Sequence, residues 1–451
     1  MGLREPQRDD AAVLSKTYHP DYDEIVLQAK QAQDYYLLVG PPGTGKTSMA
    51  LRFLVEEHLT ADGALLLMAY TNRAVDEICS MLMDAGIDFI RIANRYSTDK
   101  RFHPYLMEAV VEACPKRKAI QRRLLEARVV VGTTSMLLSR SYLFQFKPFS
   151  LAIVDEASQI LEPHLMGLLC EVTKFILIGD HKQLPAVVQQ DAEESAVHDE
   201  SLLNIELDNC RNSLFERLIR IERKANRQSF VGILRKQGRM HPDVAAFPSR
   251  EFYQAEQLEP VPLAHQLDTG LPYHLPSTDA IDDFLKSRRV LFFPSRVTGR
   301  TTSDKVNADE AHIVVDLLRR IYRFYGDRFD ATKTVGVIVP YRNQIAMIRQ
   351  HLELLQIPEL EEISIDTIER YQGSQRDIII YSFTICNRYQ LDFLTNNSFE
   401  ENGHVIDRKL NVALTRARLQ MIMTGHLSTL RQNAIFRKMI EEIEEKGGIW
   451  T

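Results

Sequence analysis

Short apolar runs alternate with longer amphipathic segments along almost the whole chain. The runs are rich in Leu and β-branched residues, and the segments between them repeat their apolar residues at helical spacing. The clearest helical segments are Ala308–Tyr325 and Arg342–Leu355. We expect strands at Tyr35–Val39, Ala64–Tyr70, Arg128–Gly132, Leu151–Val154, Phe175–Ile178, Val290–Phe293, Val335–Val339, Ile363–Asp366, Ile378–Ser382 and Met421–Thr424. Because strand and helix alternate in two successive series, the pattern predicts an α/β protein with two parallel sheets.

The two series divide the chain into two expected domains, residues 1–235 and 236–451. The first should contain a short, basic, helical insertion at 92–128 and should end in a mainly helical bridge at 187–235. Residues 254–286 are rich in Pro, Asp and His, so we expect an irregular connection there. A chain of 451 residues has enough material for two or three domains of ordinary size.

Composition and charge then narrow the class of protein. Hydrophobic residues make up 45% of the chain and charged residues 26%, which is the balance of a globular protein. No apolar run approaches the roughly 18 residues of a transmembrane helix, and the N-terminus lacks the apolar stretch of a signal peptide. The five cysteines are scattered without a CxxC pair, so no zinc site, iron–sulfur cluster or disulfide framework is indicated, and we expect a cytoplasmic protein. Since the net charge is −6, nucleic acid would have to bind in a local basic groove.

A phosphate-binding loop follows the first predicted strand. Residues 40–47 read GPPGTGKT and open a predicted helix, which is the context that the GxxxxGK[ST] pattern requires. Glycines let backbone N–H groups turn toward phosphates, and a helix N-terminus favours negative charge. Lys46 should reach the β- and γ-phosphates of ATP, and Thr47 should bind Mg²⁺. The expected nucleotide contacts are Gly40, Pro41, Pro42, Gly43, Thr44, Gly45, Lys46, Thr47 and Ser48.

An acidic pair, Asp155 and Glu156, ends another predicted strand. Asp155 should bind Mg²⁺ through water, and Glu156 should orient or deprotonate the attacking water. The loop and the acidic pair together predict a P-loop NTPase. They do not select its class, because ring-forming remodelling ATPases share both features.

Further segments occur in a fixed order along both halves. The first half contains AYTNRAVD at 69–76, VGTTS at 131–135, DEASQ at 155–159 and GDHKQLPA at 179–186. The second half contains QGRMHP at 237–242, VGVIVPYRNQ at 335–344, YQGSQRD at 371–377 and DRKLNVALTRAR at 407–418. Over about residues 20–430 the series resembles the superfamily 1B helicases, the group of the nonsense-mediated-decay helicase and the Okazaki-fragment helicase–nuclease. The resemblance implies two RecA-like P-loop NTPase domains, with ATP and nucleic acid at the cleft between them.

The resemblance also implies roles for individual residues. Lys46, Glu156 and Gln183 would act on the nucleotide, with Gln183 sensing the γ-phosphate. Arg239 and Arg416 would be arginine fingers, and Gly373 and Gln375 further nucleotide contacts. Nucleic-acid contacts are implied at Thr71, Asn72, Thr133, Thr134, Tyr341, Arg342 and Thr367. Hydroxyls at strand ends also often cap helices, so the threonines have a second interpretation.

Three features depart from the family pattern. The family usually carries a Gln well upstream of the phosphate loop to read adenine, whereas Gln28, Gln31 and Gln33 lie nearer to the loop. Gly238 replaces a Tyr that is common before the Arg of the QGRMHP segment, and Gln375 replaces a usual Glu. We therefore hypothesise that the protein discriminates weakly between nucleotide bases.

The interval between residue 76 and the strand at 128–132 bears on the choice of nucleic acid. It is short and basic, cannot hold the barrel inserted there in the decay helicase, and resembles the Okazaki-fragment helicase. We therefore expect a 5′→3′ helicase or translocase on single-stranded DNA, active in replication or repair. An RNA helicase is the nearest alternative, and GDHKQLPA and LNVALTRAR disfavour a ring ATPase. We also expect a monomer without a nuclease domain, with a nuclease or repair partner in trans.

Overall fold

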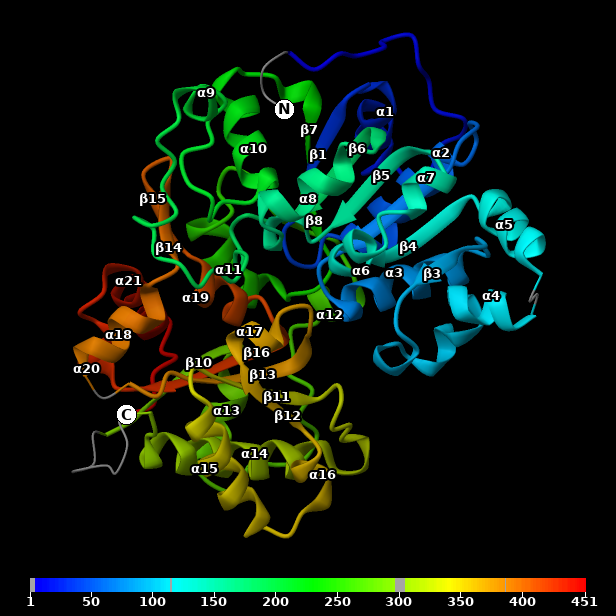
Figure 1. Ribbon diagram of the computed structural model, residues 1–451. Helices are drawn as coiled ribbons and strands as arrows, with labels where there is room; N and C mark the ends of the chain where they lie inside the picture. Colours follow the sequence, from blue (N-terminus) through cyan, green and yellow to red (C-terminus); the bar gives the residue numbers. More distant parts are fainter. Residues whose placement is uncertain (1–4, 114–115, 297–304, 386) are drawn as a thin grey trace. The chain divides into compact units, whose positions relative to one another are not determined.

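The computed structural model describes residues 5–113, 116–296, 305–385 and 387–451 (Figure 1). Two compact units are defined by their internal contacts. Unit 1 comprises Met1–His181 and Pro185–Lys236, and unit 2 comprises Lys182–Leu184 and Gln237–Thr451. Two of the five cysteines, Cys114 and Cys386, lie outside the described residues.

Unit 1 is built on a seven-stranded sheet in the order β3-β4-β2-β5-β6-β1-β7, with every neighbouring pair parallel. Parallel pairing needs a crossover between strands, and helices supply most of these crossovers. The strands are β1 (Tyr35–Val39), β2 (Leu65–Ala69), β3 (Ile90–Ile92), β4 (Val129–Thr133), β5 (Phe149–Asp155), β6 (Val172–Gly179) and β7 (Val231–Ile233).

Both faces of this sheet are buried, as expected for a parallel sheet. Alternate strand residues point to opposite sides, so Leu38 and Leu67 enter one apolar cluster while Leu37 and Leu66 enter another. The first cluster is closed by α1 (Asp23–Gln31), α2 (Arg52–His58) and α3 (Asn72–Asp84). The second is closed mainly by α5 (Arg117–Glu126), α6 (Thr134–Ser139), α7 (Leu143–Phe146), α8 (Glu162–Leu169) and α10 (Leu214–Lys224).

Unit 2 contains a five-stranded parallel sheet in the order β10-β16-β13-β11-β12. Its strands are β10 (Val290–Pro294), β11 (Val335–Val339), β12 (Ser364–Thr367), β13 (Arg376–Ser382) and β16 (Ala417–Gly425). One face packs on α13 (Ala280–Ser287), α14 (Ala308–Tyr325), α15 (Arg342–Glu353) and α16 (Pro358–Glu361). The other packs on α11 (Pro242–Glu251), α17 (Ile368–Tyr371), α18 (Arg388–Thr395), α19 (Arg408–Leu414), α20 (Leu427–Leu430) and α21 (Ala434–Glu445). The antiparallel hairpin β14 (Ser398–Glu401) and β15 (His404–Asp407) is drawn in orange in Figure 1.

These two sheets confirm the predicted fold class of two parallel-sheet α/β domains, and each predicted strand forms, with shifts of a few residues at its ends. Several details differ from the expectation. The predicted bridge at 187–235 contains α9 (Glu200–Leu203) and α10, but it also contains β7, which pairs with β1 at the edge of the unit 1 sheet. The stretch expected to be irregular contains α12 (Ala264–Leu267) and most of α13. β3 and β7 have three residues each, too few for periodicity to reveal them.

The basic insertion folds as the short helices η2 (Arg95–Ser97), η3 (Lys100–Tyr105), α4 (Met107–Ala113) and α5. Among the described ranges, none of the helices combines the length and the apolar character needed to cross a membrane.

Candidate nucleotide and nucleic-acid sites

The predicted site residues of unit 1 lie at one edge of its sheet, where the parallel strands end. The phosphate loop follows β1, Asp155 ends β5, and Thr71 and Thr133 end or follow β2 and β4. Ligands of parallel α/β sheets bind beyond the carboxyl ends of the strands, because the loops there converge. The strand order therefore places candidate nucleotide contacts on one half of this edge and candidate nucleic-acid contacts on the other.

The phosphate loop is a tight cradle that requires glycine at three positions. Gly43 and Gly45 have φ of +77° and +72°, in the left-handed region that favours glycine. A Cβ on Gly40 would lie 2.2 Å from Cγ of Lys46, so the loop leaves no room for a side chain there. The Lys46 ammonium donates to the Gly40 carbonyl oxygen at 2.8 Å and lies 3.7 Å from a Glu156 carboxylate oxygen. These contacts hold the lysine across the mouth of the loop.

The helix behind the loop begins as a wide turn, η1 (Lys46–Leu51), and continues into α2. Its first turn aims Thr47 at β5, where its hydroxyl donates to Asp155 at 2.6 Å. Glu156 follows with φ of +51°, an unusual backbone for a non-glycine residue and one that concentrates at functional sites. The Gln159 amide donates to the Glu156 carboxylate at 3.0 Å and orients it. Lys46, Thr47, Asp155 and Glu156 are therefore gathered at one point.

The electrostatics of this point suit a cation. Burial raises the pKa of the Asp155 carboxyl to about 6, and the neighbouring Glu156 carboxylate adds to the rise, while Thr47 and Lys46 oppose it. A divalent cation beside the carboxylate would favour its ionised form. Hydroxyl and carboxylate oxygens are the ligands that Mg²⁺ prefers, so Thr47 and Asp155 fit that ion.

The hydroxyls at the other half of the edge have a structural role. Thr71 is the N-cap of α3 and accepts from the Ala74 N–H at 3.2 Å. Thr133 is the N-cap of α6 and accepts from the Met136 N–H at 3.3 Å. Thr134 is buried, whereas Thr71 and Asn72 are exposed. Capping does not prevent a hydroxyl at a helix start from facing a phosphate as well, so their nucleic-acid role stays a prediction.

Residues 182–184 follow β6 along the chain but group with unit 2. There the Arg416 guanidinium donates to the side-chain oxygen of Gln183 at 2.7 Å and to the Val412 carbonyl at 3.0 Å. Arg416 is almost fully buried, as are Gln183 and Lys182. The two residues that the resemblance assigns to the γ-phosphate are thus held together within one unit.

Three further predicted residues join this group at the amino ends of β13 and β16. The Arg239 guanidinium donates to the Thr415 carbonyl at 3.3 Å, next to Arg416. Gln375 immediately precedes Arg376, whose N–H donates to the Arg416 carbonyl at 3.1 Å. Gly373 lies two residues earlier, with φ of +80°. Every predicted nucleotide residue of unit 2 thus lies at the amino edge of its sheet.

The predicted nucleic-acid residues of unit 2 lie at the opposite, carboxyl edge. Thr367 ends β12, and Tyr341 and Arg342 follow β11 at the start of α15. The Tyr341 ring stacks on Phe393, with centroids 5.2 Å apart and an interplanar angle of 24°.

A buried ion cluster that the sequence analysis did not identify supports Gln183. The Lys182 ammonium pairs with Glu256 at 2.7 Å and Glu401 at 2.8 Å. The Asn411 side chain donates to the Lys182 carbonyl at 2.7 Å and to the Tyr253 hydroxyl at 2.8 Å. A lysine inside the motif GDHKQLPA was visible in the sequence, but its partners come from segments that only the fold brings together.

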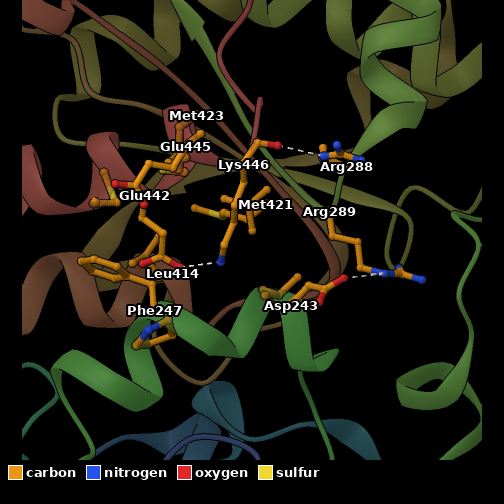
Figure 2. Close-up of a pocket in the computed structure, with 15 residues that line it drawn as sticks. Asp243, Phe247, Arg288, Arg289, Leu414, Met421, Met423, Glu442, Glu445 and Lys446 are labelled. Carbon is orange, nitrogen blue, oxygen red and sulfur yellow. Dashed lines mark hydrogen bonds and ion pairs between the residues drawn. The ribbon is translucent and has the colours of Figure 1, made fainter.

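A pocket of about 440 Å³ lies elsewhere in unit 2, between α11, α21, β10 and β16 (Figure 2). Its walls are mainly apolar and include Met421, Met423 and Leu414, and its rim carries the ion pair of Lys446 with Glu442 at 2.6 Å. Among the residues described there, none of the predicted site residues lines it. The pocket therefore does not coincide with the candidate chemistry.

Two family models match the chain, and both are described as an AAA domain. One covers residues 20–118 and 112–191, and the other covers residues 210–428. The chain is 29% identical over 472 residues to the DNA replication ATP-dependent helicase/nuclease JHS1 of Arabidopsis thaliana, covering 100% of this chain and 32% of that protein. It is 28% identical over 468 residues to the DNA replication ATP-dependent helicase/nuclease dna2 of Schizosaccharomyces pombe, covering 100% of this chain and 31% of that one.

A further relative is the DNA polymerase alpha-associated DNA helicase A of Saccharomyces cerevisiae, 27% identical over 354 residues, with 74% of this chain and 47% of that protein covered. The chain spans about a third of the length of the two helicase/nucleases. Among solved structures, the Arterivirus nonstructural protein 10 (helicase) is similar at 15% identity and a TM-score of 0.42, over 88% of this chain and 60% of that one. A TM-score at that level does not decide the fold, which follows from the two sheets themselves.

Proposed function

The chain belongs to the superfamily 1B helicases, as the motor core of that family, and on this premise we propose that it is an ATP-dependent helicase or translocase that moves 5′→3′ along single-stranded DNA. Two of its relatives are DNA replication helicase/nucleases and a third is a DNA helicase, and this chain covers only part of the length of each. We further propose that the protein acts as a monomer in replication or repair, with any nuclease acting in trans.

The observation that carries the proposal is the convergence of Lys46, Thr47, Asp155 and Glu156 at the carboxyl edge of unit 1. Bound MgATP would supply the phosphoryl group that water attacks. The cradle of backbone N–H groups and the Lys46 ammonium would bind its phosphates, while Thr47 and Asp155 would hold Mg²⁺. Glu156, oriented by Gln159, would accept a proton from the attacking water.

Unit 2 would contribute positive charge to the same reaction. Arg416 and Arg239 are the candidates, and Gln183, bonded to Arg416, would report the state of the γ-phosphate to unit 2. An arginine finger raises the rate of hydrolysis roughly 10³–10⁵-fold. A motor can therefore make hydrolysis depend on whether the arginine of unit 2 reaches the γ-phosphate.

The decisive experiment measures ATP hydrolysis by the purified chain with and without single-stranded DNA or RNA. We expect DNA to stimulate turnover more than RNA, and Lys46→Ala to abolish turnover while leaving strand binding largely intact. Displacement of strands from duplexes with 5′ or 3′ tails then tests the polarity. If neither DNA nor RNA stimulates hydrolysis, the motor assignment is wrong, and stronger stimulation by RNA would favour the RNA helicase.

Relaxed discrimination between bases is part of the proposal. The glutamines nearest to the phosphate loop are engaged within unit 1: Gln28 accepts from the Tyr36 hydroxyl at 3.1 Å, and Gln31 donates to the Ala12 carbonyl at 3.1 Å. Gln33 donates to the Gln31 carbonyl at 3.2 Å. We expect similar hydrolysis rates with ATP, GTP and CTP, and a steep preference for ATP would contradict this part of the proposal.

A further inference from the structure

Tyr22 contacts the phosphate loop, although it precedes every site residue that the sequence predicts. It lies at the start of α1, and its side chain is buried. Its hydroxyl donates to the Thr44 carbonyl oxygen at 3.0 Å, and Thr44 is itself buried within the loop. The loop leaves room for this approach because Gly45 has no side chain: a Cβ there would lie 2.7 Å from the Tyr22 hydroxyl oxygen.

The Tyr22 ring is fixed in place by its neighbours. It packs edge-on against His19, with centroids 5.4 Å apart, and against Phe53 of α2, with centroids 5.5 Å apart. Phe53 also contacts the Tyr18 ring, at a centroid distance of 5.3 Å. Because α2 continues the helix that the phosphate loop opens, the ring packs on that helix while its hydroxyl contacts the loop in front of it.

A buried carboxylate fastens the segment before Tyr22 to the far end of α2. Glu57 is almost fully buried, and it accepts from the Ser15 hydroxyl at 2.6 Å and from the Tyr18 hydroxyl at 2.8 Å. The Lys30 ammonium of α1 pairs with it at 2.6 Å. Although burial opposes ionisation, these three groups lower the pKa of the Glu57 carboxyl to about 2, so it stays charged at neutral pH. The segment that carries Tyr22 is therefore firmly attached to the helix behind the loop.

The bond to Thr44 fixes the direction of one peptide group of the loop. The peptide between Thr44 and Gly45 is trans, so its C=O and its N–H point to opposite sides. While Tyr22 holds the carbonyl oxygen, the Gly45 N–H is turned away from Tyr22. Burial raises the pKa of the Tyr22 hydroxyl, and the Asp21 carboxylate adds to the rise, so the oxygen keeps the proton that it donates. Backbone N–H groups are what a loop of this pattern offers to phosphates.

We propose that Tyr22 is a positioning residue for the nucleotide, which holds the Thr44–Gly45 peptide with its N–H ready for a phosphate oxygen before ATP arrives. A loop that is already arranged binds phosphates more tightly, because binding does not have to turn and order the peptide. The inference rests on the proposed function, since it assigns Tyr22 to the same ATP site. Tyr22 should therefore affect how tightly nucleotide binds and not how fast bound ATP reacts.

The test replaces Tyr22 by Phe, which keeps the ring and removes only the hydroxyl. Isothermal titration calorimetry of the full chain with MgADP should show about threefold to tenfold weaker binding, the effect of one lost hydrogen bond. In steady-state hydrolysis with single-stranded DNA, KM for ATP should rise by a similar factor while kcat stays within about twofold. Tyr36→Phe is the matched control, because Tyr36 is fully buried in the same unit and its hydroxyl donates to Gln28 rather than to the loop.

The two tyrosine variants separate a role at the loop from a general loss of stability. Tyr36→Phe should bind MgADP like the unmodified protein, although each variant loses one buried hydroxyl. Equal affinities for the two variants, or a fall in kcat with unchanged KM in Tyr22→Phe, would overturn the inference. Calorimetry needs neither hydrolysis nor a strand. If no strand stimulates hydrolysis while Tyr22→Phe still weakens MgADP binding, the proposed motor function fails and the role of Tyr22 stands, so the two failures are distinguishable.

Discussion

Arg416 and Arg418 lie two residues apart, but the fold holds them in different ways. Arg416 is buried and bonded to Gln183, whereas Arg418 is partly exposed and pairs with Asp377 at 2.6 Å. If Arg416 supplies charge to the γ-phosphate, Arg416→Lys should lower strand-stimulated hydrolysis about 10³-fold, because an ammonium cannot reproduce the planar fork of a guanidinium. Steady-state hydrolysis at saturating ATP and DNA measures this.

Arg418→Lys is the matched control and should stay within about fivefold of the unmodified protein, since a lysine can keep the partly exposed ion pair with Asp377. Nucleotide binding by both variants should be retained, because the cradle around Lys46 is unchanged. Equal rates for the two variants would remove the finger role from Arg416.

Glu310 shows how a single buried carboxyl makes stability depend on pH. It accepts from the Ser382 hydroxyl and the Thr384 N–H, both at 2.7 Å, and burial raises its pKa from 4.5 to about 7. Between these values the folded protein keeps a proton that the unfolded chain has released. The free energy of unfolding should therefore fall as pH rises from about 4.5 to 7, by roughly 1.4 kcal/mol per unit, and then level off.

Urea denaturation of the unmodified protein and Glu310→Gln at pH 5, 6, 7 and 8 tests this expectation. Trp450 is the chain's single tryptophan and packs on Phe284 in unit 2, so its fluorescence reports the unit that contains Glu310. The difference between the two proteins cancels the contributions of other groups. A difference that does not change with pH would show that Glu310 is already ionised in the folded state at pH 5.

At the scale of elements, continuous apolar runs predicted the central strands well. β1 and β11 form at the predicted residues because each is five apolar residues or glycine, buried on both sides. The hairpin β14–β15 was missed because its strands are polar, with exposed residues. Its turn, Asn402-Gly403, has φ of +53° and +78°, and an Asn-Gly pair is the strongest short signal for such a turn. The site residues were predictable where a motif fixes them, whereas the partners of Lys182 depend on distant pairings that no local pattern encodes.

Lys182 joins the hairpin β14–β15 to the segment after α11, because its ammonium pairs with Glu401 in the hairpin and with Glu256 in that segment. Replacing it by Met would leave Glu256 and Glu401 without their shared cation, and Glu256 is fully buried. We expect Lys182→Met to lower the free energy of unfolding of unit 2 by about 3–5 kcal/mol, as for other broken buried ion pairs. Trp450 fluorescence during urea denaturation measures the change.

Lys446→Met is the comparison, because Lys446 pairs with Glu442 at 2.6 Å but is 58% exposed. Its loss should cost less than about 1 kcal/mol. Lys182→Arg keeps the charge, so its loss of unfolding free energy should lie between those of Lys182→Met and Lys446→Met. If Lys182→Met is no more destabilising than Lys446→Met, the cluster does not anchor residues 182–184.

At the scale of the whole molecule, the presence of a second full sheet distinguishes a helicase motor from a ring-forming ATPase. A ring ATPase needs a neighbouring subunit to supply its arginine, and it carries a sensor helix rather than a second full sheet. This chain contains a second sheet of five parallel strands, with Arg239 and Arg416 at its amino edge. One chain therefore holds both the phosphate loop and the candidate fingers.

We therefore expect sedimentation velocity to give a single species of about 52 kDa, the mass of one chain, with or without ATP and Mg²⁺. The specific rate of DNA-stimulated hydrolysis should likewise be independent of protein concentration, because no second copy completes the site. Mixing the Lys46→Ala and Arg416→Lys variants gives a sharper test. In a ring, an intact loop from one copy could meet an intact arginine from the next, so activity would reappear. In a motor that works within one chain, the mixture should stay as inactive as its components.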